Sequence, residues 1–185
     1  PNYNVTLLNL WDKHTLLCCS RWQGLLLLDL NTGKCRRPPF DCGKEIMNVL
    51  IDSQKRIWVA PYNGGLNCLT HDGKLLATYT THNSSLSNNV ILSLAEREGE
   101  IWIGTDGGGI NSFDQKTNTF HHYPTTYGEK VTSITDFSEN ELLLSCFNKG
   151  VFTFNKRTAQ MQPFPIINDS ISKREFSSGD LVNLY

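Results

Sequence analysis

A glycine-rich stretch is the first place where this sequence could do chemistry. Glu100 to Phe113 reads E-I-W-I-G-T-D-G-G-G-I-N-S-F and contains a G-x-x-x-x-G from Gly104 to Gly109. A phosphate-binding P-loop needs Lys and then Ser or Thr after the last glycine, because the ammonium reaches the phosphates and the hydroxyl holds magnesium. Ile110 and Asn111 stand there instead. The dinucleotide pattern G-x-G-x-x-G is also absent, so we expect no nucleotide site in this loop.

Acid and base chemistry would have to come from side chains such as Tyr62, His82, Asp106 and Glu129. Catalysis needs two such groups within hydrogen-bond reach of one substrate position. No spacing in the sequence ensures this, and the titratable groups are scattered along the chain. We therefore expect no catalytic residues in this segment, and we keep a carbohydrate lyase or hydrolase as an alternative.

Histidine and cysteine are the side chains that could hold a metal ion. His121 and His122 are adjacent, and neighbours on a strand point to opposite faces, so they cannot easily share one ion. The six cysteines form no C-x-x-C pair and no Cys/His ligand spacing. We expect neither a metal site nor a cofactor.

The cysteines have two other interpretations. An oxidising compartment would permit a bridge between Cys35 and Cys42, whereas buried thiols would act as small apolar side chains. The sequence favours the second interpretation. It places Cys18, Cys19 and Cys68 in predicted strands and Cys146 in a loop.

The glycine-rich stretch occurs four times, which explains it better than phosphate binding does. The copies begin at Thr15, Arg56, Glu100 and Glu141 and are anchored by Gly24, Gly65, Gly109 and Gly150. A period of about 40 to 45 residues with short strands is typical of a β-propeller, in which each repeat is one four-stranded blade. Before each copy an apolar residue opens a short run, at Val5, Ile46, Ile91 and Val131, and an aromatic residue closes each unit, at Phe40, Tyr79, Tyr123 and Phe164.

The last copy shows the strand pattern of a blade. Runs of β-branched, aromatic and aliphatic residues predict strands A to D at 131–134, 142–144, 151–154 and 161–164. Turn-forming residues predict the C–D turns at 29–34, 71–74, 115–118 and 156–158. The anchoring glycines then fall in the B–C loops. There we expect them to adopt a backbone conformation that a Cβ would resist, or to lie against a neighbouring blade.

The best copy resembles the repeat of a known family. I-W-I-G-T-D-G-G-G-I-N-S-F-D from Ile101, K-T-N-T-F-H-H-Y after it, and S-S-L-S-N-N-V-I-L-S-L from Ser84 resemble the two-component regulator propeller repeat. The second and third copies match well. The first and fourth are degenerate, with Cys-Cys-Ser or Ser-Cys in place of Gly-Thr.

The resemblance implies a function and a location. Such repeats occur mainly in the periplasmic sensor region of bacterial hybrid two-component sensor histidine kinases, many in Bacteroides-like species that respond to polysaccharide fragments. It implies a periplasmic sensor that binds an oligosaccharide, forms a homodimer in the full receptor and signals to a histidine kinase of the parent chain. A plain protein-interaction propeller remains an alternative, as does a propeller-type lyase or hydrolase.

The repeats also predict the domain organisation. We expect an all-β partial propeller over residues 1–185, with blades near 4–43, 44–88, 89–128 and 129–178 and the first strand of a fifth at 179–185. The segment would belong to a larger propeller of about seven blades, as the resemblance implies. A polar, serine-rich stretch from Ile167 to Asp180 is expected to be a long inter-blade loop.

Composition excludes some classes of partner. The formal net charge is −1, whereas a nucleic-acid binder should show a basic face. No apolar stretch approaches 18 residues, so we expect no membrane span in this segment.

The candidate ligand site lies on the loops at one end of the blades. Strands A to D alternate in direction, so the B–C and D–A loops share one face, where propellers usually bind ligands. Aromatic rings mixed with amide and charged groups suit a saccharide, whose ring face stacks while its hydroxyls form hydrogen bonds. The candidate residues are Arg21, Trp22, Gln23, Tyr62, Asn63, Asp106, Phe147, Asn148 and Lys149, with Thr105 beside them. Trp58 and Trp102 share a strand B position and are expected to pack within the blades.

Overall fold

The chain is all-β in the computed structural model, which describes residues 4–20, 23–125 and 130–165. These residues form four antiparallel sheets of four strands each, with the strands of every sheet in chain order. This confirms the predicted class of four four-stranded blades. The expected first strand of a fifth blade and the loop at 167–180 lie outside the described residues.

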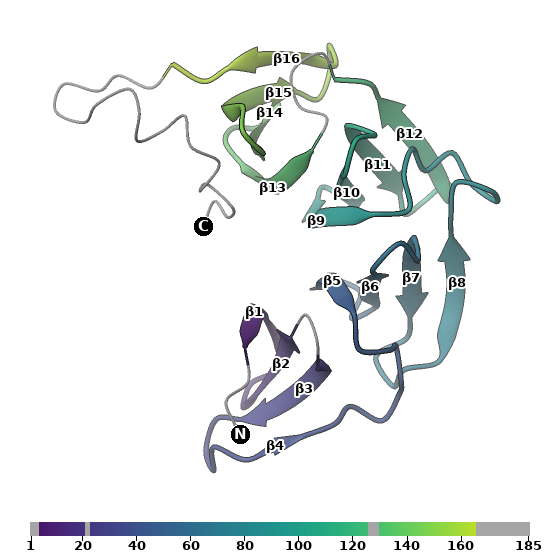
Figure 1. Cartoon of the computed structure of the whole chain (residues 1–185), viewed down its shortest axis with the longest axis vertical. Helices are drawn as coiled ribbons and strands as arrows, with labels where there is room; N and C mark the ends of the chain where they lie inside the picture. Colours follow the sequence, from purple (N-terminus) through teal and green to yellow (C-terminus); the bar gives the residue numbers. More distant parts are fainter. Residues whose placement is uncertain (1–3, 21–22, 126–129, 166–185) are drawn as a thin grey trace, which may run out of the picture. The chain divides into compact units, whose positions relative to one another are not determined.

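The strands of blades 1 and 2 belong to one compact unit, Pro1–Ser84 with Asn89–Ile91. Blade 1 consists of β1 (Val5–Asp12), β2 (Thr15–Ser20), β3 (Gly24–Asp29) and β4 (Cys35–Arg36). Blade 2 consists of β5 (Ile46–Ile51), β6 (Ile57–Pro61), β7 (Leu66–Leu69) and β8 (Leu75–Tyr79). Figure 1 labels each strand.

Blades 3 and 4, apart from Ile91 at the start of strand A of blade 3, belong to a second compact unit, Ser85–Asn88 with Leu92–Tyr185, which we describe separately. Blade 3 consists of β9 (Ile91–Arg97), β10 (Glu100–Thr105), β11 (Ile110–Asp114) and β12 (Thr119–Tyr123). Blade 4 consists of β13 (Val131–Asp136), β14 (Glu141–Cys146), β15 (Gly150–Asn155) and β16 (Gln160–Pro163).

The first unit is held together by apolar side chains between its two blades. Leu17 and Cys19 of β2 and Leu25 of β3 pack with Ile46 of β5 and Val59 of β6 in one buried cluster. Burying an aliphatic side chain of this size contributes about 1.5–3 kcal/mol. The alternation of buried and exposed residues along β1 places Trp11 in the same cluster and leaves Leu8 and Leu10 exposed.

Aromatic rings dominate the core of the second unit. Trp102 of β10 stacks on Tyr123 of β12, with ring centroids 5.7 Å apart, and meets the edge of Phe154 of β15 at 5.8 Å. Ile110 and Val131 are fully buried in the same cluster. Trp102 and Phe154 come from different blades, so these rings fix blade 3 against blade 4.

The C–D turns repeat one local structure. In blades 1, 3 and 4 the last strand C residue is Asp29, Asp114 or Asn155, and its Oδ1 accepts hydrogen bonds from the backbone N–H groups two and three residues later. Such Asx turns reverse a chain without a tight two-residue hairpin. The turns lie where the sequence predicts them.

The structure changes the expected position of one cysteine. Cys146 is the buried last residue of β14 and not a loop residue, because strand B continues to its pairing with Gly150. All six cysteines are free thiols, with Cys35 exposed and Cys42 packed against the blade 1–blade 2 core. Burial raises the pKa of the Cys42 thiol to about 12 and that of Cys19 to about 11.

Candidate functional site

The B–C loop of blade 2 presents an aromatic ring to solvent. Tyr62 follows β6 and is 56% exposed, and its backbone N–H donates to the Glu45 carbonyl at 2.8 Å. Asn63 has a φ of 53° and Gly65 a φ of 71°. A Cβ on Gly65 would lie 2.1 Å from the carbonyl oxygen of Tyr79 in the same blade. This glycine therefore has the backbone conformation that the sequence predicts, whereas its close approach is to its own blade and not to a neighbouring one.

The B–C loop of blade 4 repeats that geometry. Phe147 is 47% exposed and its backbone N–H donates to the Lys130 carbonyl at 3.0 Å. Asn148 has a φ of 57°, and Gly150 follows after Lys149 with a φ of 97°. Asn63 and Asn148 therefore occupy the same left-handed position, which Asn tolerates better than most residues. Their side chains are candidates for ligand contact, but the left-handed turn alone explains why asparagine occurs at both positions.

Blade 3 has a different loop, in which Thr105 is structural. Thr105 is the buried last residue of β10, not an exposed loop residue as the sequence suggests. Its Oγ1 donates to the Gly109 carbonyl at 2.9 Å and accepts from the Gly108 N–H at 3.1 Å. Both hydrogen-bonding roles of the hydroxyl are used within the loop, so Thr105 is unavailable to a ligand.

Asp106 of this loop joins a charged and aromatic cluster. Its carboxylate lies 2.9 Å from Nζ of Lys130, which precedes β13, and the Lys130 ammonium lies 5.9 Å from the ring centroid of Phe147. Asp106 and Lys130 also form a backbone bridge. B–C loops and a D–A connection thus meet on one face of the second unit, as strand alternation predicts. We call Asp106, Lys130 and Phe147 the loop cluster.

The sequence interpretation missed Lys130. The signal was present, because Lys130 lies directly before strand A of blade 4 in a D–A connection, and these connections were expected on the B–C face. The ion pair itself is half-exposed, and exposed pairs contribute about 0–1 kcal/mol. The Asp106–Lys130 ion pair therefore orients the lysine side chain, and breaking it requires little free energy.

The B–C loop of blade 1 is only partly described. Arg21 and Trp22 lie outside the described residues. The Gln23 carbonyl accepts a hydrogen bond from Arg37, while the Gln23 Oε1 is buried without a hydrogen-bond partner among the described residues. Gly24 has a φ of 75°, and a Cβ there would lie 2.6 Å from the Gly43 carbonyl oxygen.

The metal-ligating side chains of the described residues form no cluster. Within the described residues, no group of three or more His, Cys, Asp or Glu side chains could hold a metal ion. His122 binds the Gly108 carbonyl through Nε2 at 2.9 Å, which gives it a structural partner. Asp106 is paired with Lys130, and Glu129 lies outside the described residues.

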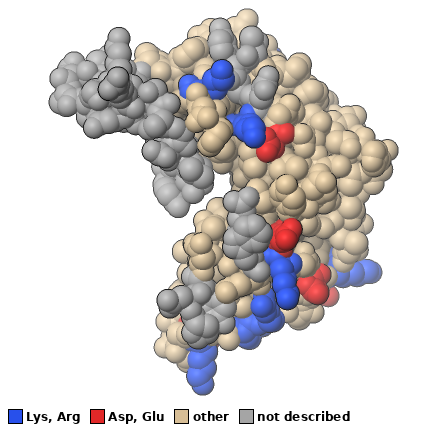
Figure 2. Space-filling view, viewed as in Figure 1, with Lys and Arg blue, Asp and Glu red and all other residues tan. Residues whose placement is uncertain are grey.

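Surface charge is mixed on the face that Figure 2 shows. Lys and Arg side chains lie among Asp and Glu side chains, and no broad basic patch is visible on that face. Among the described residues, no helix is long and apolar enough to cross a membrane.

Solved structures with a similar fold come from several kinds of protein. The extracellular domain of a protein named as the one component system BT4673 of B. thetaiotaomicron is 22% identical, with a TM-score of 0.72 over 100% of this chain and 25% of that one. The extracellular domain of one named as the hybrid two component system BT3049 of B. thetaiotaomicron is 19% identical, with a TM-score of 0.71 over 89% and 25%. The RRP9 WD40 repeats are 10% identical, with a TM-score of 0.69 over 88% and 52%.

These similarities establish the propeller fold. The chain spans a quarter of the length of the two B. thetaiotaomicron domains. No curated protein matches the sequence. Residues 85–107, which comprise strand A and strand B of blade 3 with the segment before them, match the family described as "Two component regulator propeller". The resemblance seen in the sequence is thus confirmed at residues 85–107, which match the two-component regulator propeller model, and the chain has a β-propeller fold.

Proposed function

We propose that the chain is part of an extracytoplasmic sensor propeller that binds an oligosaccharide on its B–C loop face and signals to a histidine kinase. The family match at residues 85–107 supports the sensor class. The similar B. thetaiotaomicron structures are extracellular domains by name, which supports the location. The kinase would lie in the parent chain, and the propeller segment itself would not be an enzyme.

The loop cluster is the observation that carries the ligand part of the proposal. Phe147 offers an exposed ring face, and Asp106 and Lys130 place an acceptor and a donor beside it. A sugar ring buries its apolar face against such a ring while its hydroxyls bond to the charged groups. In the first unit, Tyr62 presents an equivalent ring from the same turn.

Signalling would follow from rigid-body movement. Rearranging a blade would disrupt its packed core, which is energetically costly. A rigid-body movement of one protomer relative to the other leaves the cores intact and is the mechanism that we propose. We therefore propose a homodimer in the full receptor. Autophosphorylation of the parent protein, with and without the bound saccharide, tests this part separately.

A binding experiment tests the ligand part. The full chain is screened against neutral and acidic oligosaccharides by isothermal titration, and the best ligand is repeated with Phe147→Ala and with Lys130→Met. Loss of the ring should weaken binding about three- to tenfold. Phe137→Ala is the control, because Phe137 is similarly exposed at 50% but lies at the A–B turn of the same blade and packs against Phe164.

Two results would contradict the proposal. One is that no oligosaccharide binds at all. The other is that Phe147→Ala and Phe137→Ala weaken binding equally, since the ring would then act through stability and not through contact.

A further inference from the structure

A second candidate site lies at the other end of blades 3 and 4. A cleft of about 290 Å³ opens where the A–B and C–D turns of the second unit meet. Trp102 and Tyr123 line it together with charged residues from these turns: Arg97, Lys156 and Arg157, and Glu98, Glu100 and Glu139. Its volume is at the lower limit of pockets that hold small ligands.

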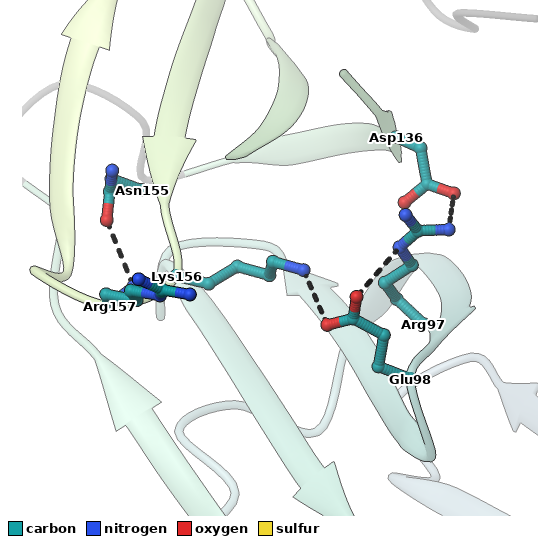
Figure 3. Close-up of polar contacts among 6 residues, drawn as sticks. All are labelled: Arg97, Glu98, Asp136, Asn155, Lys156 and Arg157. Atoms are coloured by element: carbon teal, nitrogen blue, oxygen red, sulfur yellow. Dashed lines mark hydrogen bonds and ion pairs between the residues drawn. The ribbon is translucent and has the colours of Figure 1, made fainter. Parts of the chain in front are cut away.

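Part of this charge is already paired. Figure 3 shows Lys156, Glu98, Arg97 and Asp136 in a row joined by dashed lines. Lys156 Nζ lies 2.8 Å from Glu98, Glu98 lies 3.9 Å from Arg97 Nε, and Arg97 Nη1 lies 3.0 Å from Asp136. Lys156 and Asp136 belong to blade 4 and the other two to blade 3. The row therefore ties the two walls of the cleft together.

The remaining charges have no such partner. Within the described part of the chain, the Arg157 guanidinium and the carboxylates of Glu100 and Glu139 take part in no ion pair. Burial and the nearby Asp114 carboxylate raise the pKa of Glu100. The cleft thus offers one unpaired cation and two unpaired carboxylates, one of which is in an environment that disfavours its charge.

Two buried N–H donors in the cleft wall also lack acceptors. Nε1 of Trp102 and Nε of Arg97 are shielded from solvent, and neither has a hydrogen-bond partner among the described residues. In blade 2 the equivalent Trp58 donates through Nε1 to Asp52, directly after strand A. The step from Trp58 to Trp102 places Glu96 of β9 at the position of Asp52. Arg97 and Glu98, which follow Glu96, line the cleft together with Trp102.

We propose that this cleft binds a small zwitterion of the α-amino acid class. The ligand carboxylate accepts from the Trp102 and Arg97 N–H groups and pairs with Arg157. The ligand ammonium pairs with Glu100 and Glu139. The lining carries three cations and three carboxylates, so its formal net charge is zero. A zwitterion also has no net charge and therefore leaves the net charge of the site unchanged when it binds.

Other ligand classes satisfy fewer of these groups. A polyanion would meet three carboxylates, and a simple cation would leave both buried N–H donors unsatisfied. A neutral polyol could bond to the donors but would bring no charged partner to Arg157 or Glu100. The zwitterion provides both charges in one molecule.

This inference is independent of the saccharide proposal, because the cleft and the loop cluster lie at opposite ends of the blades. Isothermal titration of the full chain with each of the common L-α-amino acids tests it. Propionate and ethylamine, which each carry one of the two charges, and glucose serve as comparison ligands. We expect at least one amino acid to bind at a single site and the comparison ligands to bind at least about tenfold more weakly.

Variants then locate the site. Arg157→Gln should weaken amino-acid binding at least about tenfold, and Trp102→Phe about threefold or more, because the N–H is lost while a smaller aromatic ring remains. Arg36→Gln, an exposed change on β4, should leave binding unchanged. Phe147→Ala in the loop cluster should also leave it unchanged.

Three results would overturn the proposal. The first is that no amino acid binds, and the second is that both cleft variants bind as tightly as the unmodified chain. The third is that glucose binds as well and competes with the amino acid, which would assign the cleft to a different ligand class. Urea unfolding of each variant shows that any loss of binding is not a loss of folding.

Discussion

Trp58 and Trp102 occupy the same position of strand B in neighbouring repeats, but only Trp58 has an acceptor for its indole N–H among the described residues. Both side chains are almost fully buried, at 0% and 1% exposure. Nε1 of Trp58 lies 2.9 Å from Oδ2 of Asp52, whereas Nε1 of Trp102 has no partner there. The repeat therefore conserves the ring and changes its polar environment.

This difference predicts unequal costs for the same substitution. Trp58→Phe and Trp102→Phe leave cavities of the same kind, but Trp58→Phe also breaks a buried hydrogen bond to a carboxylate. We expect Trp58→Phe to lower the free energy of unfolding by about 1–3 kcal/mol more than Trp102→Phe. Urea unfolding of the two variants measures the difference. Equal costs would mean that the Trp58 hydrogen bond contributes nothing net.

Asp52 is predicted to be the most sensitive carboxylate of blade 2. It is fully buried and accepts from Nε and the backbone N–H of Arg56, both at 2.7 Å, as well as from Trp58. Asp52→Ala removes the acceptor of all three donors and should cost about 3–5 kcal/mol in denaturant unfolding.

Asp52→Asn is the matched variant for that experiment. It keeps one acceptor oxygen in place and should cost clearly less than Asp52→Ala. If the two variants were equally stable, the carboxylate would not be the organising group of this turn.

The blade pattern could be predicted because it is local. The strands expected at 131–134, 142–144, 151–154 and 161–164 correspond to β13, β14, β15 and β16, since each needs only a short run of β-forming residues between turn formers. The main errors occur at strand ends. Thr105 and Cys146 are each the last residue of a strand B. Both are small and lie next to turn-forming residues, so the sequence pattern predicts a loop there.

The cleft could not be predicted for the opposite reason. Its ion pairs join residues far apart in sequence, such as Arg97 with Asp136 and Glu98 with Lys156. Their contact depends on how two blades pack, and no local pattern encodes that. The loop cluster is intermediate: strand alternation predicts which loops share a face, but not that Lys130 would reach Asp106.

Gly33 and Gly65 have nearly the same φ angle but different surroundings. Substituting each by Ala therefore distinguishes the cost of the left-handed backbone conformation from the cost of a steric clash. Gly33 has a φ of 68° and Gly65 a φ of 71°, but a Cβ on Gly33 would meet no heavy atom within 4 Å, whereas one on Gly65 would overlap the Tyr79 carbonyl. Gly33→Ala should cost about 1–2 kcal/mol from the left-handed conformation alone. Gly65→Ala should cost about 1–3 kcal/mol more because the strand must also move.

Thermal or urea unfolding of these two variants provides the measurement. If both substitutions lowered the free energy of unfolding by a similar amount, strand D of blade 2 would be able to move away from the added Cβ at little energetic cost. The B–C loop glycine would then be required only for its φ angle.

Two glutamates of the cleft should respond to pH in opposite directions. Burial and Asp114 raise the pKa of Glu100 above its ordinary value of 4.5, so its ionised form is less favourable in the folded state. Its stabilising effect is therefore present at acid pH and is lost as the pH rises through the folded-state pKa. Glu100→Gln should leave the melting temperature unchanged near about pH 4 and raise it near about pH 7.

Glu98 is the internal control, because the hydrogen bond and charge of Lys156 lower its pKa. Its contribution is present above the ordinary pKa and is lost as the pH falls through the folded-state value, so Glu98→Gln should lower the melting temperature at neutral pH and have little effect in acid. Melting curves of both variants across this range check the signs. If both substitutions shifted the neutral-pH melting temperature in the same direction, the separation of the cleft into paired and unpaired carboxylates would be wrong. The zwitterion proposal would then lose the unpaired Glu100 on which its ammonium contact depends.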